Sequence, residues 1–339
     1  MFAAPIVCLF RHSFRGLRCH PDTDPEIEWG WRATGGGLSG ALCSERMRIG
    51  LHCSTSGALV NAARRAVEVG ANCFQIFSSS PRMWRAAMPP GEQIEALRRF
   101  RAEHDLAPLV IHDSYLINLA APDEDIRAKS IGAMRGELER AFAIGAEFLV
   151  IHPGSARQDP VEAGIARIVE SLAEASRRLR PPNGFMLLLE NTAGAGATIG
   201  RTLEELRELR ERLEPVLPFP VGYCLDTCHL FVSGYDVSTA AGLAATVRQA
   251  QEALGLEHVP VIHTNDSRGA FGSRLDRHAN IGEGRIGLAG FRRILHHPDL
   301  RRKAFVLETP VDNPGDDQRN VEQLKKLCRK SRTATKKSS

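Results

Sequence analysis

Short apolar segments alternate with amphipathic segments along most of the chain. Eight apolar segments of five or six residues recur, at 48–52, 73–77, 108–112, 148–152, 185–190, 221–226, 259–263 and 304–308. Between them, segments such as GALVNAARRAVEVGA and RTLEELRELRERLE place apolar residues at helical spacing. Because the short segments are apolar at consecutive positions, we expect strands that are buried on both faces of a parallel sheet. Eight strand and helix units predict an α/β fold, a single (β/α)8 TIM barrel, rather than an open doubly wound sheet.

This pattern stops at both ends of the chain. Residues 1–46 contain CHPDTDPE and TGGGLSG and show no sustained periodicity, so we expect an irregular N-terminal extension. Met47 directly precedes the first apolar segment, so the extension is either dispensable or lies upstream of the true start. A transit peptide is a competing interpretation, because the first 20 residues contain arginines but no acid. We expect a barrel domain at 47–324 and a basic, flexible tail at 325–339.

The charge is unevenly distributed. The formal net charge is +4, but residues 325–339 contain seven Lys and Arg and no acid, whereas residues 47–324 contain 32 basic and 35 acidic residues. A barrel with this balance needs help, such as bound metal cations, to bind a polyanion. The basic tail could add salt-sensitive, non-specific affinity for such a polyanion.

Cysteine usage and hydropathy set the expected compartment. The eight cysteines are scattered without a C-x-x-C pair, which is typical of reduced thiols in an intracellular protein. No apolar run approaches the roughly 18 residues that a membrane span needs, so we expect no membrane partner. We predict a cytoplasmic, bacterial-type, nucleoid-associated protein, with organellar or nuclear targeting left open. No feature requires an oligomer, so a monomer is expected.

Polar residues end seven of the eight apolar segments. They are His52, His112, His152, Glu190, Asp226, His263 and Glu308, and only Phe77 breaks the rule. The carboxyl ends of barrel strands converge on one face, where so many polar groups would repel or remain unsatisfied. Imidazole and carboxylate groups are ligands of zinc and manganese, so a metal centre is indicated. The loops add His229 and the pair Asp276 and His278, which face one way in extended backbone.

The order of these motifs resembles one known family. IHDSYLINLA, IHPGS, LLENTAGAG, LDTCH, HTNDS, FGSRLDRHANIGEG and LET are together similar to the endonuclease IV family of abasic-site DNA endonucleases, type 2. The resemblance covers nearly all of residues 47–324 and implies a barrel endonuclease with three zinc ions, with manganese possible at some sites. It implies that His112 and His152 hold the first zinc, with Glu190 bridging to the second. It assigns Asp226, His263 and Glu308 to the second zinc, and His229, Asp276 and His278 to the third.

The resemblance also implies a reaction and a substrate. In base excision repair, the expected reaction is hydrolysis of the phosphodiester 5′ to an abasic site in double-stranded DNA, with 3′-end trimming as a further activity. Glu190 is the implied catalytic residue, because it would help to position the attacking hydroxide. Arg82, Tyr115 and Leu116 match residues that enter the minor groove. Cys53, Ala58 and the Ser80–Pro81 pair depart from the family pattern, which puts details of phosphate contact in doubt.

Two other functions fit parts of the same pattern. A xylose-isomerase-like metal-dependent sugar isomerase or epimerase would share the barrel and use similar ligands. Nine ligands in three groups exceed what a one- or two-metal isomerase requires. A non-catalytic binder of damaged DNA is the second alternative, and the complete ligand set argues against it. Cys224 and Cys228 lie beside Asp226 in the sequence, and we expect both to be packing residues rather than ligands.

Overall fold

The computed structural model describes residues 47–329, and in this range the eight expected strands form one closed barrel. Every neighbouring pair is parallel, and β10 closes the barrel by pairing with both β1 and β7. The prediction of a TIM barrel is therefore confirmed. The barrel strands are β1 (Arg48–His52), β2 (Cys73–Phe77), β3 (Leu109–His112), β4 (Phe148–Ile151), β5 (Met186–Glu190), β6 (Val221–Asp226), β7 (Val261–His263) and β10 (Ala304–Leu307).

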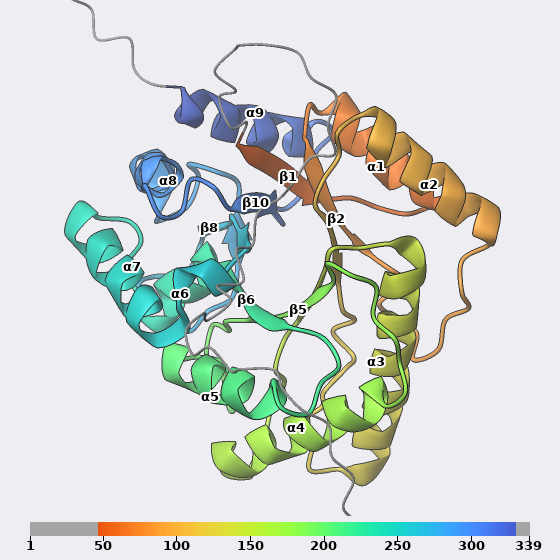
Figure 1. Cartoon of the computed structure of the whole chain (residues 1–339). Helices are drawn as coiled ribbons and strands as arrows, with labels where there is room; N and C mark the ends of the chain where they lie inside the picture. Colours follow the sequence, from red (N-terminus) through yellow and green to blue (C-terminus); the bar gives the residue numbers. More distant parts are fainter. Residues whose placement is uncertain (1–46, 330–339) are drawn as a thin grey trace, which may run out of the picture. The chain divides into compact units, whose positions relative to one another are not determined.

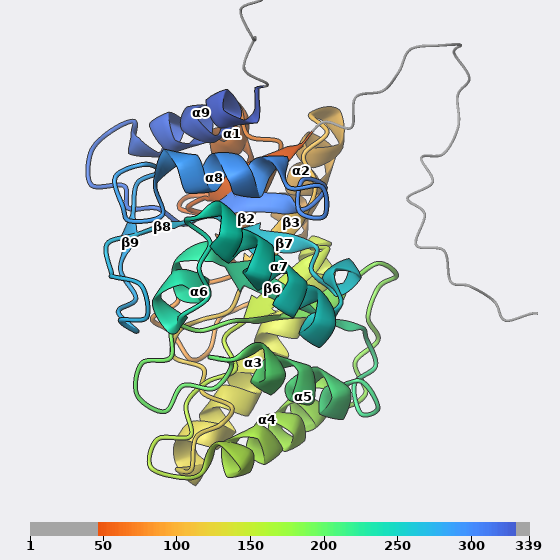
Figure 2. The same ribbon diagram turned by 90° about the vertical axis from the view of Figure 1, so that its left-hand side faces the viewer.

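Helices surround these strands (Figure 1). They are α1 (Leu59–Glu68), α2 (Gly91–Glu103), α3 (Glu124–Ile144), α4 (Val161–Ser176), α5 (Leu203–Leu213), α6 (Thr227–Ser233), α7 (Ala240–Leu254), α8 (Gly287–His296) and α9 (Asp316–Cys328), with a 3₁₀ turn at Leu256–His258. After β7 the chain adds a short antiparallel pair, β8 (Asp266–Ser267) and β9 (His278–Ala279), which lies beside α6 (Figure 2). Among residues 47–329, no helix is both long and apolar enough to cross a membrane.

The strands are apolar throughout because each is packed on two sides. One large cluster of buried residues lies between the strands and the helices. A second, separate cluster takes its side chains from the strands at alternate positions: Cys73, Val110, Val150, Leu188, Cys224, Val261, Ala304 and Val306. Side chains two residues further along a strand point to the same side. The polar residues at the strand ends therefore form the next layer above this inner cluster, and Cys224 lies in the cluster as expected.

Close contact between β1 and β2 depends on a glycine. A Cβ atom added at Gly50 would lie 2.2 Å from the backbone oxygen of Cys73, so no larger residue fits there. Gly50 also pairs with Cys73 in the strand register. Two residues further along, His52 pairs with Gln75. The close strands thus bring these two side chains to the same end of the barrel.

The predicted start of the flexible tail at residue 325 is wrong by four residues. Helix α9 continues to Cys328, and its buried residues include Leu324 and Leu327. The pair Lys325 and Lys326 made the sequence look like the start of a basic tail, although Leu324 and Leu327 on either side keep the helical spacing of apolar residues. Residues 330–339 and the extension at 1–46 lie outside the described residues, so the expectations for them remain predictions.

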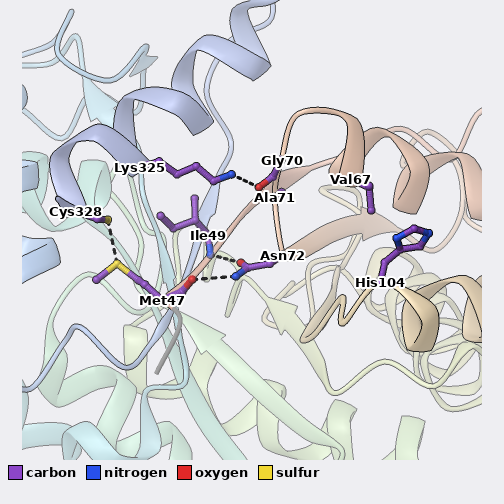
Figure 3. A pocket seen from close by; sticks show the side chains of 9 residues that line it. All are labelled: Met47, Ile49, Val67, Gly70, Ala71, Asn72, His104, Lys325 and Cys328. Carbon is purple, nitrogen blue, oxygen red and sulfur yellow. Dashed lines mark hydrogen bonds between the residues drawn. The ribbon is translucent and has the colours of Figure 1, made fainter. Parts of the chain in front are cut away.

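The end of α9 lies against the start of β1, at the opposite end of the barrel from the polar strand ends. Lys325 Nζ donates a hydrogen bond to the backbone oxygen of Gly70, and Cys328 Sγ lies 3.2 Å from Met47 Sδ. These contacts border a cavity of about 300 Å³ (Figure 3). The contacts explain why residues 325–328 are ordered as a helix rather than as a tail.

Candidate metal centre

The nine predicted ligands converge on the carboxyl ends of the strands. Four of them, His112, Glu190, Asp226 and His263, are the last residues of their strands, and His152 and Glu308 follow β4 and β10 directly. The remaining three come from α6 and from the loop that ends in β9. Among residues 47–329, five overlapping sets of side chains have their ligand atoms within 4.8 Å of one another. Three of these sets together contain all nine residues and are called the three groups below: His112, His152 and Glu190; Glu190, Asp226, His263 and Glu308; and His229, Asp276 and His278.

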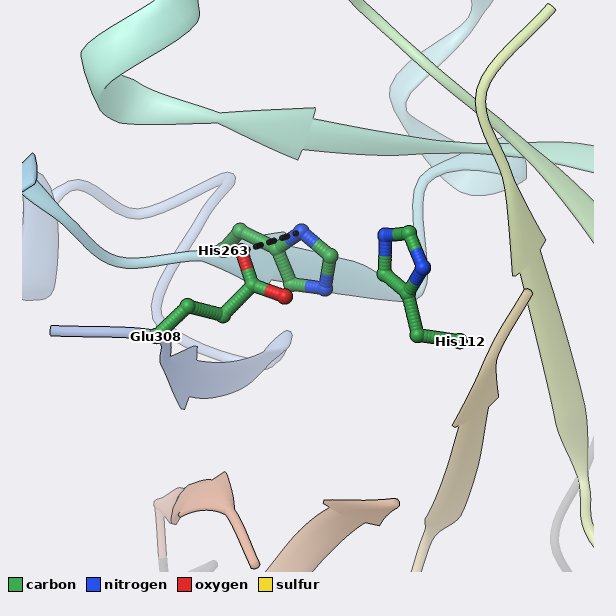
Figure 4. A group of neighbouring side chains, drawn as sticks. All are labelled: His112, His263 and Glu308. Carbon is green, nitrogen blue, oxygen red and sulfur yellow. Dashed lines mark ion pairs between the residues drawn. The ribbon is translucent and has the colours of Figure 1, made fainter. Parts of the chain in front are cut away.

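These groups are connected. Glu190 belongs to two of them, and His112, His263 and Glu308 form a further close set across the barrel (Figure 4). The imidazole rings of His112 and His263 are stacked with centroids 5.7 Å apart. His263 Nδ1 lies 3.4 Å from Glu308 Oε2. The three groups contain the residues that the resemblance assigned together, and the assignment of an ion to each group stays a prediction.

Glu190 lies at the centre and is fully buried. Its Oε2 atom lies 3.1 Å from His112 Nε2 and 3.2 Å from His152 Nε2, whereas its Oε1 atom lies 3.0 Å from His263 Nδ1. Burial by itself raises the pKa of Glu190, but the surrounding histidines outweigh burial and hold this pKa well below its usual value. Each carboxylate oxygen therefore faces a different set of ring nitrogens, which is the arrangement of a bridging ligand.

The LDTCH motif builds the next part of the site through a helix cap. Asp226 ends β6 and is the N-cap of α6, where its Oδ1 atom accepts a hydrogen bond of 2.8 Å from His229 N. The other oxygen, Oδ2, accepts a hydrogen bond of 2.6 Å from Asn265 Nδ2. The cap thus fixes the backbone position of His229. As a result, Asp226 and His229 belong to different groups although they are only three residues apart.

The third group is the most open. Asp276 Oδ2 lies 3.2 Å from His229 Nε2, and Asp276 Oδ1 lies 3.5 Å from His278 Nε2. The Asp276 side chain is 49% exposed, in contrast to the fully buried Glu190 and Asp226. Burial raises the pKa of Asp276, but hydrogen bonding and charge from His229 lower it to about 2. This carboxylate therefore stays ionised at the edge of the centre.

A buried carboxylate outside the nine holds this loop in place. Asp266 in β8 accepts backbone hydrogen bonds from Gly282 at 2.9 Å, Gly284 at 3.0 Å and Ile286 at 2.9 Å. A Cβ atom added at Gly284 would lie 2.4 Å from Asp266 Oδ1, so the loop needs a glycine there. Because β8 pairs with β9, Asp266 also fixes the strand that carries His278.

The outer ring nitrogens show that the residues suit metal ions. The Nδ1 atoms of His112, His229 and His278 lie 2.9–3.2 Å from the backbone oxygens of Asp113, Asn191 and Glu308, respectively. His263 instead has its Nε2 atom 2.8 Å from Gln75 Oε1. Histidines that bind metals usually donate their other N–H to such acceptors. The remaining nitrogen of each ring then faces the carboxylates, where it could bind a cation after losing its proton.

Two further observations support this fit. His278 Nε2 is buried and has no hydrogen-bond partner within residues 47–329, although it points toward Asp226 and Asp276. Burial lowers the pKa of His112, but hydrogen bonding and charge from Glu190 raise it to about 9. Protonated imidazoles thus balance the buried carboxylates when no cation is bound, and divalent cations would supply the same positive charge.

Two residues that orient the ligands were missed by sequence reasoning. Gln75 lies inside β2 and is fully buried, with Nε2 2.6 Å from Glu308 Oε1 and 3.1 Å from His52 Nδ1. Asn265 Oδ1 accepts a hydrogen bond of 2.8 Å from Glu308 N. A glutamine inside the otherwise apolar CFQIF segment was the available signal for Gln75. The strand-end rule overlooked it because it precedes Phe77.

His52 lies next to the centre but in none of the three groups. Its ring lies 4.4 Å from that of Phe77, between centroids. Burial lowers the pKa of His52 to about 4, so the ring is neutral near pH 7. Its exclusion from the predicted ligand set agrees with this position.

Cys228 comes closer to the centre than expected. It forms a close set with Asp226 and His278, although its side chain is buried and its Sγ atom lies 3.9 Å from the backbone oxygen of Arg277. Burial raises the pKa of the Cys228 thiol to about 12. The expected packing role therefore stays a prediction that a substitution can test.

The three residues expected to contact DNA lie on neighbouring loops at the same barrel face. Arg82 is exposed on the loop after β2, and Tyr115, on the loop after β3, is 68% exposed. Ser114 Oγ donates a hydrogen bond of 2.8 Å to Pro81 O and so joins the two loops. Tyr115 and Leu116 line a pocket of about 520 Å³ that also reaches His112 and His152. The structure thus places these loops beside the metal centre.

Comparisons with known proteins agree with this arrangement. A family model described as "Xylose isomerase-like TIM barrel" matches residues 63–331. A protein of Solibacter usitatus named "Probable endonuclease 4" is 58% identical over 282 residues, which cover 83% of this chain and 97% of that protein. The crystal structure of endonuclease IV from Thermus thermophilus is 39% identical, with a TM-score of 0.72, and the match covers 83% of this chain and 98% of that one.

A second solved structure shows that the barrel fold by itself does not identify the reaction. A D-tagatose 3-epimerase-like protein has a TM-score of 0.61 at 20% identity, and the match covers 83% of this chain and 97% of that one. At that identity the likeness shows the barrel fold only, so the barrel does not separate an endonuclease from an epimerase. The high identity to the Solibacter usitatus protein over nearly its whole length does: this chain belongs to the endonuclease IV family.

Proposed function

We propose that this chain is a zinc-dependent endonuclease that hydrolyses the phosphodiester 5′ to an abasic site in double-stranded DNA. The observation that carries the proposal is the gathering of five histidines and four carboxylates into three neighbouring groups, two of which share Glu190. The names of the relatives, "Probable endonuclease 4" and endonuclease IV, support the same reaction class. Base excision repair is the expected process, with 3′-end trimming as a second activity at the same site.

The proposed ligands follow the three groups. His112, His152 and Glu190 would hold one zinc ion, Glu190 with Asp226, His263 and Glu308 a second, and His229, Asp276 and His278 a third. Manganese could replace zinc at some sites, because imidazole and carboxylate accept both. Bound zinc ions supply a water that loses its proton near neutral pH, and positive charge that stabilises the phosphate transition state.

The chain's own residues prepare the site for this chemistry. Glu190 is buried and held by four histidines, so its carboxylate can orient a nucleophile without reorganising during the reaction. Asp276 and His278 form the exposed side of the centre, where a DNA phosphate can approach. The barrel has slightly more acidic than basic residues, so resident cations would also attract the DNA backbone.

The loops beside the centre account for recognition of the lesion. An abasic sugar can be turned out of the duplex at lower cost than a paired and stacked nucleotide. Arg82, Tyr115 and Leu116 would fill the space that bending opens in the minor groove, and the exposed Tyr115 ring suits that role. These contacts do not require a second copy of the chain, and we propose a monomer.

One assay separates this function from the two alternatives. The full chain is incubated with zinc and without magnesium on a duplex that contains a single abasic analogue. We expect a single cut 5′ to the analogue that leaves a 3′-hydroxyl. Binding without a cut would support a damaged-DNA binder. A lack of both, together with conversion of a free ketose, would support a sugar isomerase and contradict the proposal.

A further inference from the structure

A buried ion pair lies on α3, away from the nine proposed ligands. Glu137 and Arg140 are only 3% and 5% exposed, and Arg140 Nη2 lies 2.8 Å from Glu137 Oε1. Neither residue belongs to any of the three metal groups. A Cβ atom added at Gly136 would lie 2.9 Å from Arg140 Nη1, so a glycine on the same helix makes room for the guanidinium.

The pair holds both ends of the loop that carries Arg82. At the start of the loop, Ser78 Oγ donates to Glu137 and accepts a hydrogen bond of 2.7 Å from Arg140 Nε. Further along, Arg140 Nη1 donates a hydrogen bond of 3.3 Å to Ala86 O. Between these two points Arg82 and Met83 are exposed to solvent. The loop is thus clamped at residues 78 and 86 while its tip is free to meet a ligand.

A buried ion pair of this kind often lowers the free energy of unfolding relative to apolar packing, so we expect it to have a role in fixing a geometry. A buried ion pair often contributes less to stability than apolar side chains of similar volume, because both charges lose their hydration. Hydrogen bonds to charged groups are directional, however, and fix the partner more sharply than apolar packing does. The same loop is also joined to the Tyr115 loop through Ser114 and Pro81. The clamp therefore sets the position of two loops at the barrel face.

We propose that Glu137 and Arg140 are positioning residues that present the Arg82 loop to DNA. The inference rests on the proposed endonuclease function, because it assigns the loop to the DNA contact. It places the effect of the pair on DNA binding and not on the bond-breaking step, since the clamp contacts the loop and no proposed ligand. Ser78 and the backbone oxygen of Ala86 are the two links through which the pair acts.

The mildest test is Ser78→Ala, which leaves the ion pair intact but removes its bonds to the start of the loop. The dissociation constant of a duplex with an abasic analogue should rise about fivefold, the size of effect expected for one typical hydrogen bond. The single-turnover rate at saturating DNA should stay within about twofold of the wild type. Zinc content should not change. Ser78→Thr keeps the hydroxyl and should restore the wild-type dissociation constant.

A fluorescence measurement reports the loop itself. The chain contains three tryptophans, at 29, 31 and 84, and Trp84 lies in the clamped loop. In a background with Trp29→Phe and Trp31→Phe, acrylamide should quench Trp84 more strongly after Ser78→Ala than before it. A matched control is Glu147→Gln, which breaks the ion pair of 2.7 Å between Arg101 and Glu147. That control should leave Trp84 quenching and DNA affinity unchanged.

The double variant Glu137→Met with Arg140→Met separates positioning from stability. Two apolar side chains should preserve the fold, whereas the weaker DNA binding should persist because the bonds to Ser78 and Ala86 are lost. Wild-type affinity in both Ser78→Ala and the double variant would overturn the inference while leaving the endonuclease function intact. Absence of any abasic-DNA incision by the wild-type chain would overturn the proposed function and this inference together.

Discussion

The side-chain oxygen of Gln75 lies 2.8 Å from Nε2 of His263. In His112, His229 and His278 the corresponding ring nitrogen instead lies beside a backbone oxygen. The same amide group donates to Glu308 at 2.6 Å. Gln75 therefore fixes which nitrogen of His263 faces Glu190 and how Glu308 is turned. Two proposed ligands of the second zinc depend on a residue that touches no other group of the centre except His52.

Replacing Gln75 by Leu should weaken zinc binding. We expect about a tenfold loss of affinity at the tightest affected site, the lower end of what removal of such outer partners costs. The affinity can be measured by competition with a coloured chelator. Gln251→Leu is a matched control, because Gln251 accepts a single backbone hydrogen bond from Leu256 on the outside of the barrel. Equal zinc affinity in the two variants would contradict the role given to Gln75.

The third group should depend on Asp266. In Asp266→Asn the amide can no longer accept from Gly282, Gly284 and Ile286 together, so the loop loses about 1–3 kcal/mol of stabilisation. We expect zinc content to fall from three toward two ions per chain, measured by elemental analysis after dialysis. Asp236→Asn is the control, since Asp236 also accepts backbone bonds, from Ser238 and Thr239, but far from the centre. Three retained ions in Asp266→Asn would refute the dependence.

Cys228 is expected to be dispensable for metal binding. Each of the three groups is complete without its thiol, and burial raises the pKa of that thiol to about 12, which disfavours the thiolate that binds zinc. Cys228→Ser and Cys228→Ala should therefore keep the zinc content and the incision rate of the wild type. A loss of one ion in both variants would show that the close set with Asp226 and His278 is a real thiolate site.

Removing the metal should destabilise the barrel. Without cations, the buried carboxylate of Glu190 depends on protonated histidines such as His112 for charge balance. A bound ion at a concentration about a thousandfold above its dissociation constant stabilises the folded state by about 4 kcal/mol. Thermal unfolding should therefore shift to lower temperature in the presence of a chelator and recover when zinc is added back. An unchanged melting temperature would argue against resident ions.

The strands could be predicted from the spacing of apolar residues, whereas the set of nine proposed ligands and its division into three groups came from the resemblance to the endonuclease IV family. Each ligand except those of the loops ends an apolar segment, and parallel strands bring such ends together. Gln75 was missed because a single polar residue inside an apolar strand gives no sign of where it points. Lys325 and Lys326 concealed the last turn of α9, whose apolar side lies on Leu324 and Leu327.

The ion pair on α3 shows a different limit. In the sequence, Glu137 and Arg140 are three residues apart in RGELERAF, a spacing typical of a solvated pair on a helix surface. Their burial becomes visible only when the loop from Ser78 to Ala86 is packed on them. When a distant loop buries a helical residue, the spacing of apolar residues within the helix does not predict that burial.

Glu190→Gln should separate binding from cleavage. The amide keeps the size of the side chain but removes the charge that four histidines surround, so the incision rate should fall by about a thousandfold or more. Affinity for a duplex with an abasic analogue should persist, as measured by fluorescence anisotropy. Glu92→Gln, on the exposed first turn of α2, is the control. Turnover at the wild-type rate in Glu190→Gln would remove Glu190 from the mechanism.

The central claim is that three zinc ions held by these nine residues perform the incision. Its most direct test is to titrate chelated full-length protein with zinc and to measure incision of an abasic duplex at each addition. Full activity should require three equivalents per chain, with a plateau beyond them. Full incision at one or two equivalents, or none at three, would contradict the three-zinc centre.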